Sequence, residues 1–143
     1  MRVMLDTNIL ISVGIFGGTR LAELTQKIAD EFNIVLSSQI IEELQMVIEM
    51  KFPHKKSIFD KFMSRLSFEI AFTPTEIDPD IYPKIRDKKD YPILASAIIA
   101  DVDVFVTGDK DFSAVDIERP EVMTIAEFAG KYLQPSYGCT TIL

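Results

Sequence analysis

The segment Val3-Met4-Leu5-Asp6-Thr7-Asn8 sets an apolar run directly against three polar residues. Consecutive apolar side chains put hydrophobic groups on both faces of a strand, which is typical of a strand buried in a parallel sheet. The change at Asp6 predicts that this strand ends there. A second segment, Val104-Phe105-Val106-Thr107, has the same character and is closed by Gly108 and Asp109.

Further elements are predicted from the spacing of apolar residues and from turn-forming residues. The expected helices lie at 19–28, 38–48, 58–66, 90–100 and 125–133, the other strands at 34–36, 68–72 and 122–124. Gly14, Gly17 and Gly18 predict a turn, and Pro74, Pro79 and Pro83 predict a loop. Strands that alternate with helices predict a three-layer α/β/α fold with a mainly parallel central sheet. We expect a single domain over residues 1–133 and a tail at 134–143 with no recognisable pattern.

Composition excludes several classes of protein. The 143 residues include 15 Lys and Arg against 22 Asp and Glu, a net charge of −7, which argues against a protein that coats nucleic acid through a basic surface. With only Cys139 and His54, the chain has neither a disulfide framework nor a Cys/His zinc site of its own. It has no signal-peptide pattern at its start, and its longest nearly apolar stretch, 93–100, is too short to span a bilayer. We expect a soluble, cytoplasmic protein.

Several acids fall at chain positions that converge in such a fold. Parallel α/β sheets bind their ligands outside the carboxyl ends of the strands, where Asp6 and Asp109 are expected. Asp90, at a predicted helix start, belongs to the same edge. In the helix that begins at Ser38, periodicity sets Glu42 opposite the buried stripe and Glu43 at its margin, so Glu43 is the better candidate to reach a cleft.

Crowded carboxylates repel one another unless a cation compensates them. No histidine or arginine cluster lies near these acids in the sequence. Hard oxygen ligands suit Mg²⁺ or Mn²⁺, which bind through a few carboxylates and keep waters for substrate phosphate. The chemistry indicated is metal-assisted phosphodiester hydrolysis.

Four motifs resemble one known family. They are Leu5-Asp6-Thr7-Asn8-Ile9-Leu10-Ile11-Ser12, Glu43-Leu44, Arg86-Asp87-Lys88-Lys89-Asp90-Tyr91-Pro92-Ile93-Leu94-Ala95 and Val106-Thr107-Gly108-Asp109-Lys110-Asp111-Phe112. In order and spacing the chain resembles the PIN-domain ribonucleases, especially the toxin components of bacterial and archaeal toxin–antitoxin pairs. The resemblance runs from the first strand through about Leu133.

The resemblance implies a Mg²⁺- or Mn²⁺-dependent endoribonuclease that leaves a 5′-phosphate, forms a homodimer and is inhibited by a cognate antitoxin protein. The catalytic and metal-binding acids that it implies are Asp6, Glu43, Asp90 and Asp109. The supporting residues that it implies are Thr7, Asn8 and Asp111.

Each candidate also has a purely structural interpretation. Asp6, Thr7 and Asn8 are common in turns, Asp90 is a good helix N-cap, and Asp109 and Asp111 suit a turn after a strand. Glu43 is open to interpretation as a solvated residue, and Asp87 as a loop acid. Lys51, His54, Lys55, Lys56, Lys61 and Arg65 form the chain's one basic concentration. It is interpreted as a solvated helix face, or as an RNA contact in which Lys51, Lys55 and Lys56 take part.

Rival functions have weaker support in the sequence. A phosphoryl-accepting receiver domain needs an acid pair after its first strand, where this chain has only Asp6. A haloacid-type phosphatase needs Asp-x-Asp at the same place, and Asn8 stands where the second acid belongs. The closest alternative is a catalytically silent PIN-like domain that binds RNA or protein. Because no motif acid is missing, the sequence favours the enzyme.

Overall fold

The computed structural model describes residues 1–16, 19–74 and 91–133, and its centre is one five-stranded sheet. The strands lie in the order β3-β2-β1-β4-β5, and each of the four neighbouring pairs is parallel. Their bounds are β1 Arg2–Leu5, β2 Asn33–Ser37, β3 Glu69–Ala71, β4 Val104–Val106 and β5 Glu121–Met123.

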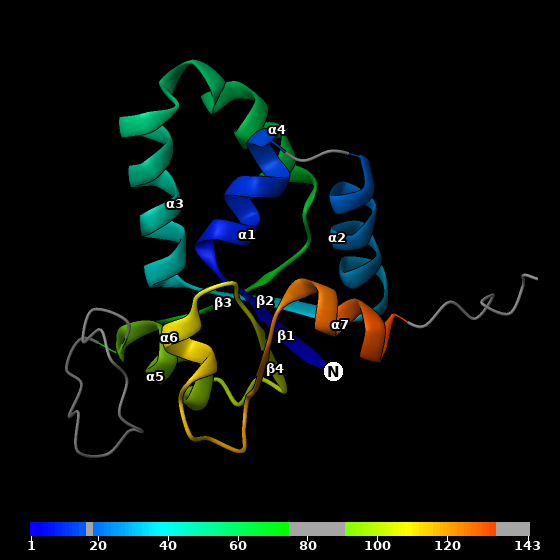
Figure 1. The fold of residues 1–143 in the computed structure, drawn as a ribbon. Coiled ribbons are helices and arrows are strands. Elements are labelled where there is room, and N and C mark those ends of the chain that lie inside the picture. The colour runs from blue at the N-terminus through cyan, green and yellow to red at the C-terminus, as the bar shows by residue number, and fades with distance from the viewer. Residues whose placement is uncertain (17–18, 75–90, 134–143) are drawn as a thin grey trace, which may run out of the picture.

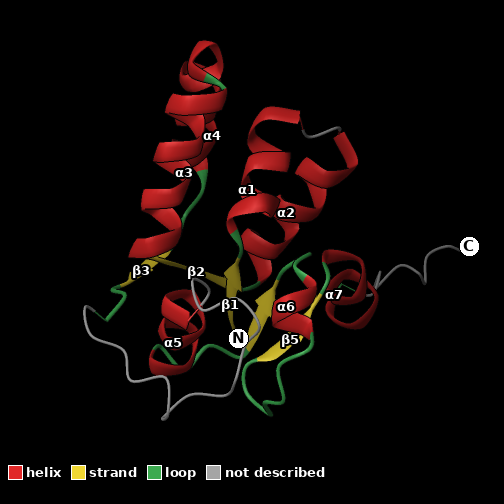
Figure 2. Cartoon of the chain, turned by 60° about the vertical axis from the view of Figure 1, so that its left-hand side comes forward, coloured by secondary structure: helices red, strands yellow, loops and turns green. Residues whose placement is uncertain are grey.

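Helices cover both faces of this sheet. Those that precede β4 are α1 Thr7–Ile11, the π-helical η1 Ser12–Phe16, α2 Thr19–Glu31, α3 Ser38–Lys51, the 3-10 helix η2 Pro53–Lys55, α4 Lys56–Arg65 and α5 Tyr91–Ile99. After β4 come α6 Lys110–Ser113 and α7 Ile125–Tyr132. Figures 1 and 2 show α1–α4 on one side of the sheet and α5 on the other, with α7 beside the lower end of α2, where the Phe128 ring packs against Phe32. The predicted three-layer α/β/α architecture is confirmed.

The central strands are buried on both faces, as their continuous apolar runs predict. Val3, Met4 and Leu5 of β1 are fully buried, and so are all three residues of β4. The side chain of Phe112 packs edge-on against Phe105 of β4, with ring centroids 4.9 Å apart. The sequence-based strands and the helices at 38–48, 58–66 and 125–133 are therefore confirmed, with ends shifted by a few residues.

The order of the strands decides where a ligand is expected. The chain builds outward from β1 through β2 to β3, and then returns to the other side of β1 to form β4 and β5. The adjacent pair β1 and β4 therefore forms the point at which strand order reverses. In open parallel sheets the crevice at the carboxyl ends of such a pair is the usual ligand site.

The predicted turn is wrong at Gly14, whereas Gly17 and Gly18 lie outside the described residues. The chain enters α1 directly after Asp6 and continues through the π-helical η1, in which Gly14 is buried. A Cβ atom at Gly14 would lie 2.7 Å from the Phe59 ring of α4 and 3.0 Å from the Phe62 ring. The glycine is therefore needed for close helix packing, which the pattern of glycines in the sequence does not distinguish from a turn.

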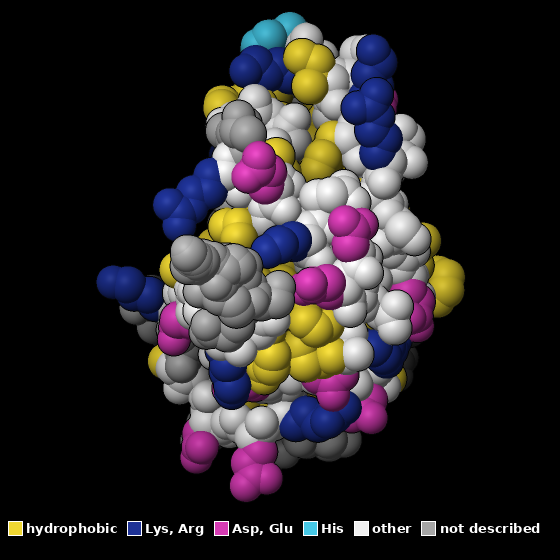
Figure 3. All heavy atoms as spheres, turned by 90° about the vertical axis from the view of Figure 1, so that its right-hand side faces the viewer, with side chains coloured by type: hydrophobic (Ala, Val, Ile, Leu, Met, Phe, Trp, Pro, Cys, Tyr) yellow, Lys and Arg dark blue, Asp and Glu magenta, His cyan; other side chains and the backbone are white. Residues whose placement is uncertain are grey.

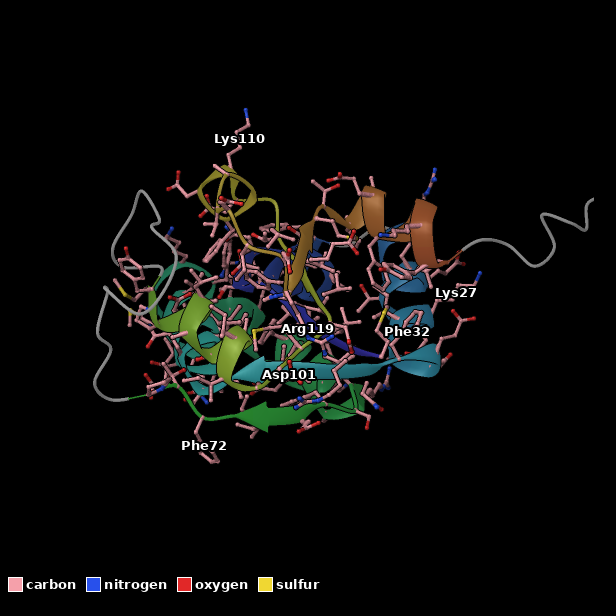
Figure 4. All side chains as sticks on the ribbon, turned by 90° about the horizontal axis from the view of Figure 1, so that it is seen from below. Lys27, Phe32, Phe72, Asp101, Lys110 and Arg119 are labelled. Atoms are coloured by element: carbon pink, nitrogen blue, oxygen red, sulfur yellow. The ribbon has the colours of Figure 1, made fainter. Side chains whose placement is uncertain are left out.

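Ion pairs and a hydrogen bond lie at the amino-terminal ends of β1, β4 and β5. Arg119 contacts Asp101 at 2.9 Å and Asp103 at 2.8 Å, and Figure 4 shows Asp101 and Arg119 together near the sheet. The Arg2 backbone N–H donates to Asp103 Oδ2 at 2.7 Å, which ties the start of β1 to the start of β4.

None of the described helices is both long enough and apolar enough to cross a membrane. The predicted start of a helix at Asp90, the loop at Pro79 and Pro83 and the tail at 134–143 lie outside the described residues.

Candidate active site

Asp6 stands where β1 ends and α1 begins. Its side chain is the N-cap of α1, because Oδ1 accepts the Thr7 backbone N–H at 2.8 Å. Its second oxygen, Oδ2, accepts the Thr107 hydroxyl at 2.7 Å, across a sequence separation of 101 residues. With only 6% of its surface exposed, Asp6 is held by both oxygens at the carboxyl ends of the two central strands.

The protonation of Asp6 reflects this position. Burial raises the pKa of the Asp6 carboxyl above its ordinary value, and the negative charges of Glu43 and Asp109 raise it further. The hydrogen bonds from Thr107 and Thr7 lower the pKa and only partly offset these effects. The pKa of Asp6 is therefore raised mainly by burial, and the nearby charges of Glu43 and Asp109 add to this effect.

Glu43 reaches the same place from α3. This helix is capped by Ser37, whose hydroxyl oxygen accepts the Ile40 N–H at 3.1 Å, and it runs beside α1. The Thr7 hydroxyl donates to Glu43 Oε2 at 2.8 Å, and Glu43 is half-buried. Glu42 is exposed, so the two neighbouring acids lie as helical periodicity predicts.

Asp109 follows β4 and caps α6. Its Oδ1 accepts the Asp111 N–H at 2.8 Å, and its own N–H donates to the Thr107 hydroxyl oxygen at 3.0 Å. Thr107 is buried, with 2% of its surface exposed. Asp109 is thus fixed through the same hydroxyl group that donates to Asp6.

These side chains border one pocket with a volume of about 210 Å³. Asp6, Glu43 and Asp109 line it together with Thr7 and Asn8, and Val47, Ile93 and Phe112 are among its apolar lining. Asp111 contributes its backbone N–H to Asp109 but is not part of the lining. Asp90 and Asp87 lie outside the described residues, immediately before α5, whose Ile93 lines the pocket.

The pocket has the donor chemistry of a divalent-cation site. Asp6, Glu43 and Asp109 offer hard anionic oxygens, the ligands that Mg²⁺ and Mn²⁺ prefer. Within residues 1–16, 19–74 and 91–133, no three Asp, Glu, His or Cys side chains lie close enough to hold a metal ion together. Mg²⁺ is commonly held by one or two carboxylates and several waters, so the described acids fit such an ion.

Two threonines organise the acids, and sequence reasoning identified only one of them. Thr7 donates its N–H to Asp6 and its hydroxyl to Glu43, and its supporting role in the site remains a prediction. Thr107 joins Asp6 to Asp109 through its hydroxyl alone, which donates to Asp6 Oδ2 and accepts the Asp109 backbone N–H. The sequence did contain a signal for Thr107, because this polar residue directly follows the apolar strand Val104–Val106 and stands two positions before Asp109.

The basic residues lie elsewhere. Lys51 is the last residue of α3, Lys55 ends η2, and Lys56 begins α4. None of them lines the acid pocket. Lys56 pairs with Asp60 at 2.9 Å, and the Lys55 ammonium lies 5.2 Å from the centre of the Phe16 ring.

Comparisons with known proteins agree with this fold. The family model described as PIN domain matches residues 2–111. Among solved structures, a chain from VapBC2 of Rickettsia felis, bound to a DNA fragment from its promoter, superposes with a TM-score of 0.65 at 23% sequence identity. The similarity covers 86% of this chain and 97% of that chain. No curated protein sequence matches the chain.

Proposed function

The chain belongs to the PIN-domain family, a family of nucleases, and from this premise we propose that it is a Mg²⁺- or Mn²⁺-dependent endoribonuclease. The observation that supports the proposal most strongly is the meeting of Asp6, Glu43 and Asp109 at one pocket. Asp6 follows β1, Glu43 lies on α3 and Asp109 follows the β4 strand, so the acids come from three separate parts of the chain. Asp6 and Asp109 cap α1 and α6, but capping does not explain why their charges meet that of Glu43 at one pocket against mutual repulsion.

The chain's own residues would bind and orient the reacting groups. Of Asp6, Glu43 and Asp109, with Asp90 as a fourth acid, one or two would bind the cation directly and the others through its waters. Thr7 and Thr107 would fix the carboxylates through hydrogen bonds. A bound divalent cation supplies polarisation of a phosphoryl oxygen and neutralises charge that builds up during hydrolysis. Asn8 and Asp111 would support this arrangement from its margin. The expected product carries a 5′-phosphate.

We propose further that the protein is the toxin of a toxin–antitoxin pair, that it acts in the cytoplasm, and that it forms a homodimer. The fold similarity to a chain of the VapBC2 complex supports the first point. The partner would be a cognate antitoxin protein that inhibits cleavage. In cells, we expect expression of the wild type but not of Asp6→Asn to arrest growth, and co-expression of the cognate antitoxin to relieve the arrest. Light scattering of the purified protein should give the mass of a dimer.

The experiment that tests the activity is a titration of Mg²⁺ and Mn²⁺ with an end-labelled single-stranded RNA. We expect metal-dependent cutting by the wild type and a loss of at least about 100-fold in kcat/KM for Asp6→Asn and for Asp109→Asn. The adjacent pair on α3 gives a matched control, because Glu43→Gln should lose activity and Glu42→Gln should not.

Each alternative result has a clear meaning. Unimpaired cleavage by both Asp variants would refute the acid site. Binding of metal and RNA without any cleavage would favour a second candidate function, a catalytically silent PIN-like module that binds RNA or protein. The presence of Asp6, Glu43 and Asp109 at a single pocket argues against that alternative.

A further inference from the structure

The junction between α3 and α4 carries the opposite charge to the rest of the chain. Residues 51–65 contain five Lys or Arg and one acid, Asp60, within a chain of net charge −7. We call Lys51, His54, Lys55 and Lys56 the apex. Figure 1 places this junction at the end of the molecule furthest from the sheet, and Figure 3 shows His beside Lys or Arg side chains there.

Little within the described chain compensates the apex. The Lys56–Asp60 ion pair is exposed on both sides and is worth little. Lys55 contacts the face of Phe16, and in the described residues Lys51 has no acidic partner. At the end of α3, Lys51 gains a small stabilisation from the helix dipole. This interaction explains the position of Lys51 but not why other cationic side chains gather beside it.

The apex also has a surface suited to phosphate oxygens. An open depression there is lined by the His54, Lys56 and Lys61 side chains and by two serines, Ser57 and Ser64. Its carboxylate, Asp60, is already paired with Lys56. Cationic groups and hydroxyls at an open surface contact the backbone of a nucleic acid and do not read its bases.

Helix α3 connects this surface to the acid pocket. Glu43 and Val47 both line the pocket, and Lys51 follows them at positions i+8 and i+4 in the same row of the helix. With a rise of about 1.5 Å per residue, Lys51 lies about 12 Å along the helix axis from Glu43. A strand with one phosphodiester at the pocket meets the apex if it continues along α3.

We propose that the apex binds the sugar–phosphate backbone of the single-stranded RNA substrate, a few nucleotides from the bond that is cut. This inference rests on the proposed ribonuclease function. The acid pocket and the apex have opposite charges and therefore different roles. The pocket repels a polyanion, while the apex attracts it and aligns it with α3.

The test compares two double variants of the full-length protein that change net charge equally. The apex variant is Lys51→Gln/Lys56→Gln, and the control is Arg20→Gln/Lys27→Gln on the exposed surface of α2. Binding of a labelled 12-nucleotide single-stranded RNA is measured by anisotropy in EDTA, from 0.05 to 0.4 M salt, so that the readout does not depend on cleavage.

Each backbone phosphate contact contributes about 0.7 to the salt slope of single-strand binding. The apex variant should therefore lose about 1.4 from that slope, which is roughly a 25-fold loss of affinity at 0.1 M salt relative to 1 M. The control should bind as the wild type does. In Mg²⁺ or Mn²⁺, the apex variant should also lose much of the wild type's preference, in kcat/KM, for the 12-mer over a dinucleotide.

The outcomes separate the two proposals. If the wild type cuts no RNA but the apex variant alone loses salt-dependent binding, the ribonuclease function fails and the apex remains an RNA contact. If the apex variant and the control bind RNA alike, the apex inference is overturned. Weaker binding of polyglutamate by the apex variant, with RNA binding unchanged, would likewise overturn it and assign the apex to an acidic protein.

Discussion

Replacing Thr107 by Val removes one hydroxyl group from the centre of the acid site and keeps the size of the side chain. That hydroxyl donates to Asp6 Oδ2 at 2.7 Å and accepts the Asp109 N–H at 3.0 Å, and Thr107 is buried. The loss leaves a buried carboxylate oxygen without its donor, which costs about 1.5 to 3 kcal/mol for a charged acceptor. With the Asp109 N–H also left unpaired, we expect a total of about 2 to 4 kcal/mol at neutral pH.

The cost depends on pH in a definite direction. The Thr107 hydrogen bond lowers the pKa of Asp6, so its removal raises that pKa further. A raised folded-state pKa of an acid means that stability is greatest at low pH and is lost as pH rises through that pKa. The penalty of Thr107→Val should therefore be largest at pH 7 and become smaller as the pH falls toward the ordinary Asp pKa of 3.8 and Asp6 takes up a proton.

Urea unfolding in the presence of a chelator measures this penalty at pH 4 and pH 7. Thr107→Ser is the control, because it keeps the hydroxyl and loses one buried methyl group, at about 1 kcal/mol with no pH dependence. An equal penalty for the valine variant at pH 4 and pH 7, or a penalty no larger than that of the serine variant, would refute the reasoning.

Three further substitutions test other parts of the structure. In metal-free protein, Asp6→Asn should raise the free energy of unfolding at pH 7 and lose this advantage as the pH falls toward the ordinary Asp pKa of 3.8, which urea titrations at several pH values would measure. Gly14→Ala should destabilise the fold by about 1 to 3 kcal/mol, because the added Cβ would lie 2.7 Å from the Phe59 ring. Thermal unfolding would measure this loss, and an unchanged Tm would contradict the packing argument. Arg119→Gln should change stability by less than about 1 kcal/mol, because Arg119 and Asp101 are exposed and Asp103 is only half-buried. A larger loss in the same assay would mean that these ion pairs contribute more than surface pairs usually do.

The fold class was predictable from the sequence because its evidence is local. Buried strands such as Val104–Val106 are short apolar runs, and the periodicity of α3 distinguishes its buried face from its exposed one. The order of the strands was not predictable in this way, because it depends on which distant strands pair. Helix α1 was missed because five residues are too few to display a periodic pattern, and its main signal is the Asp6 cap.

The residues of the candidate site also divide into those that local sequence patterns predict and those that only the structure reveals. Position after a strand selected Asp6 and Asp109, and helical periodicity preferred Glu43 to Glu42; the structure brings these three acids to one pocket. Their functional roles remain predictions, and Asp90 lies outside the described residues. The bridging role of Thr107 had to come from the structure, because a hydrogen bond across 101 residues leaves no trace in the local pattern.

The sequence separation between Asp6 and Thr107 also determines when the acid pocket can form during synthesis on the ribosome. At translation speeds of about 5 to 20 residues per second, Thr107 is added roughly 5 to 20 s after Asp6. During that interval β1 has no β4 beside it, and the carboxylates have no common pocket. A nascent chain therefore cannot form the acid pocket until both Thr107 and Asp109 have been added and β4 can pair with β1.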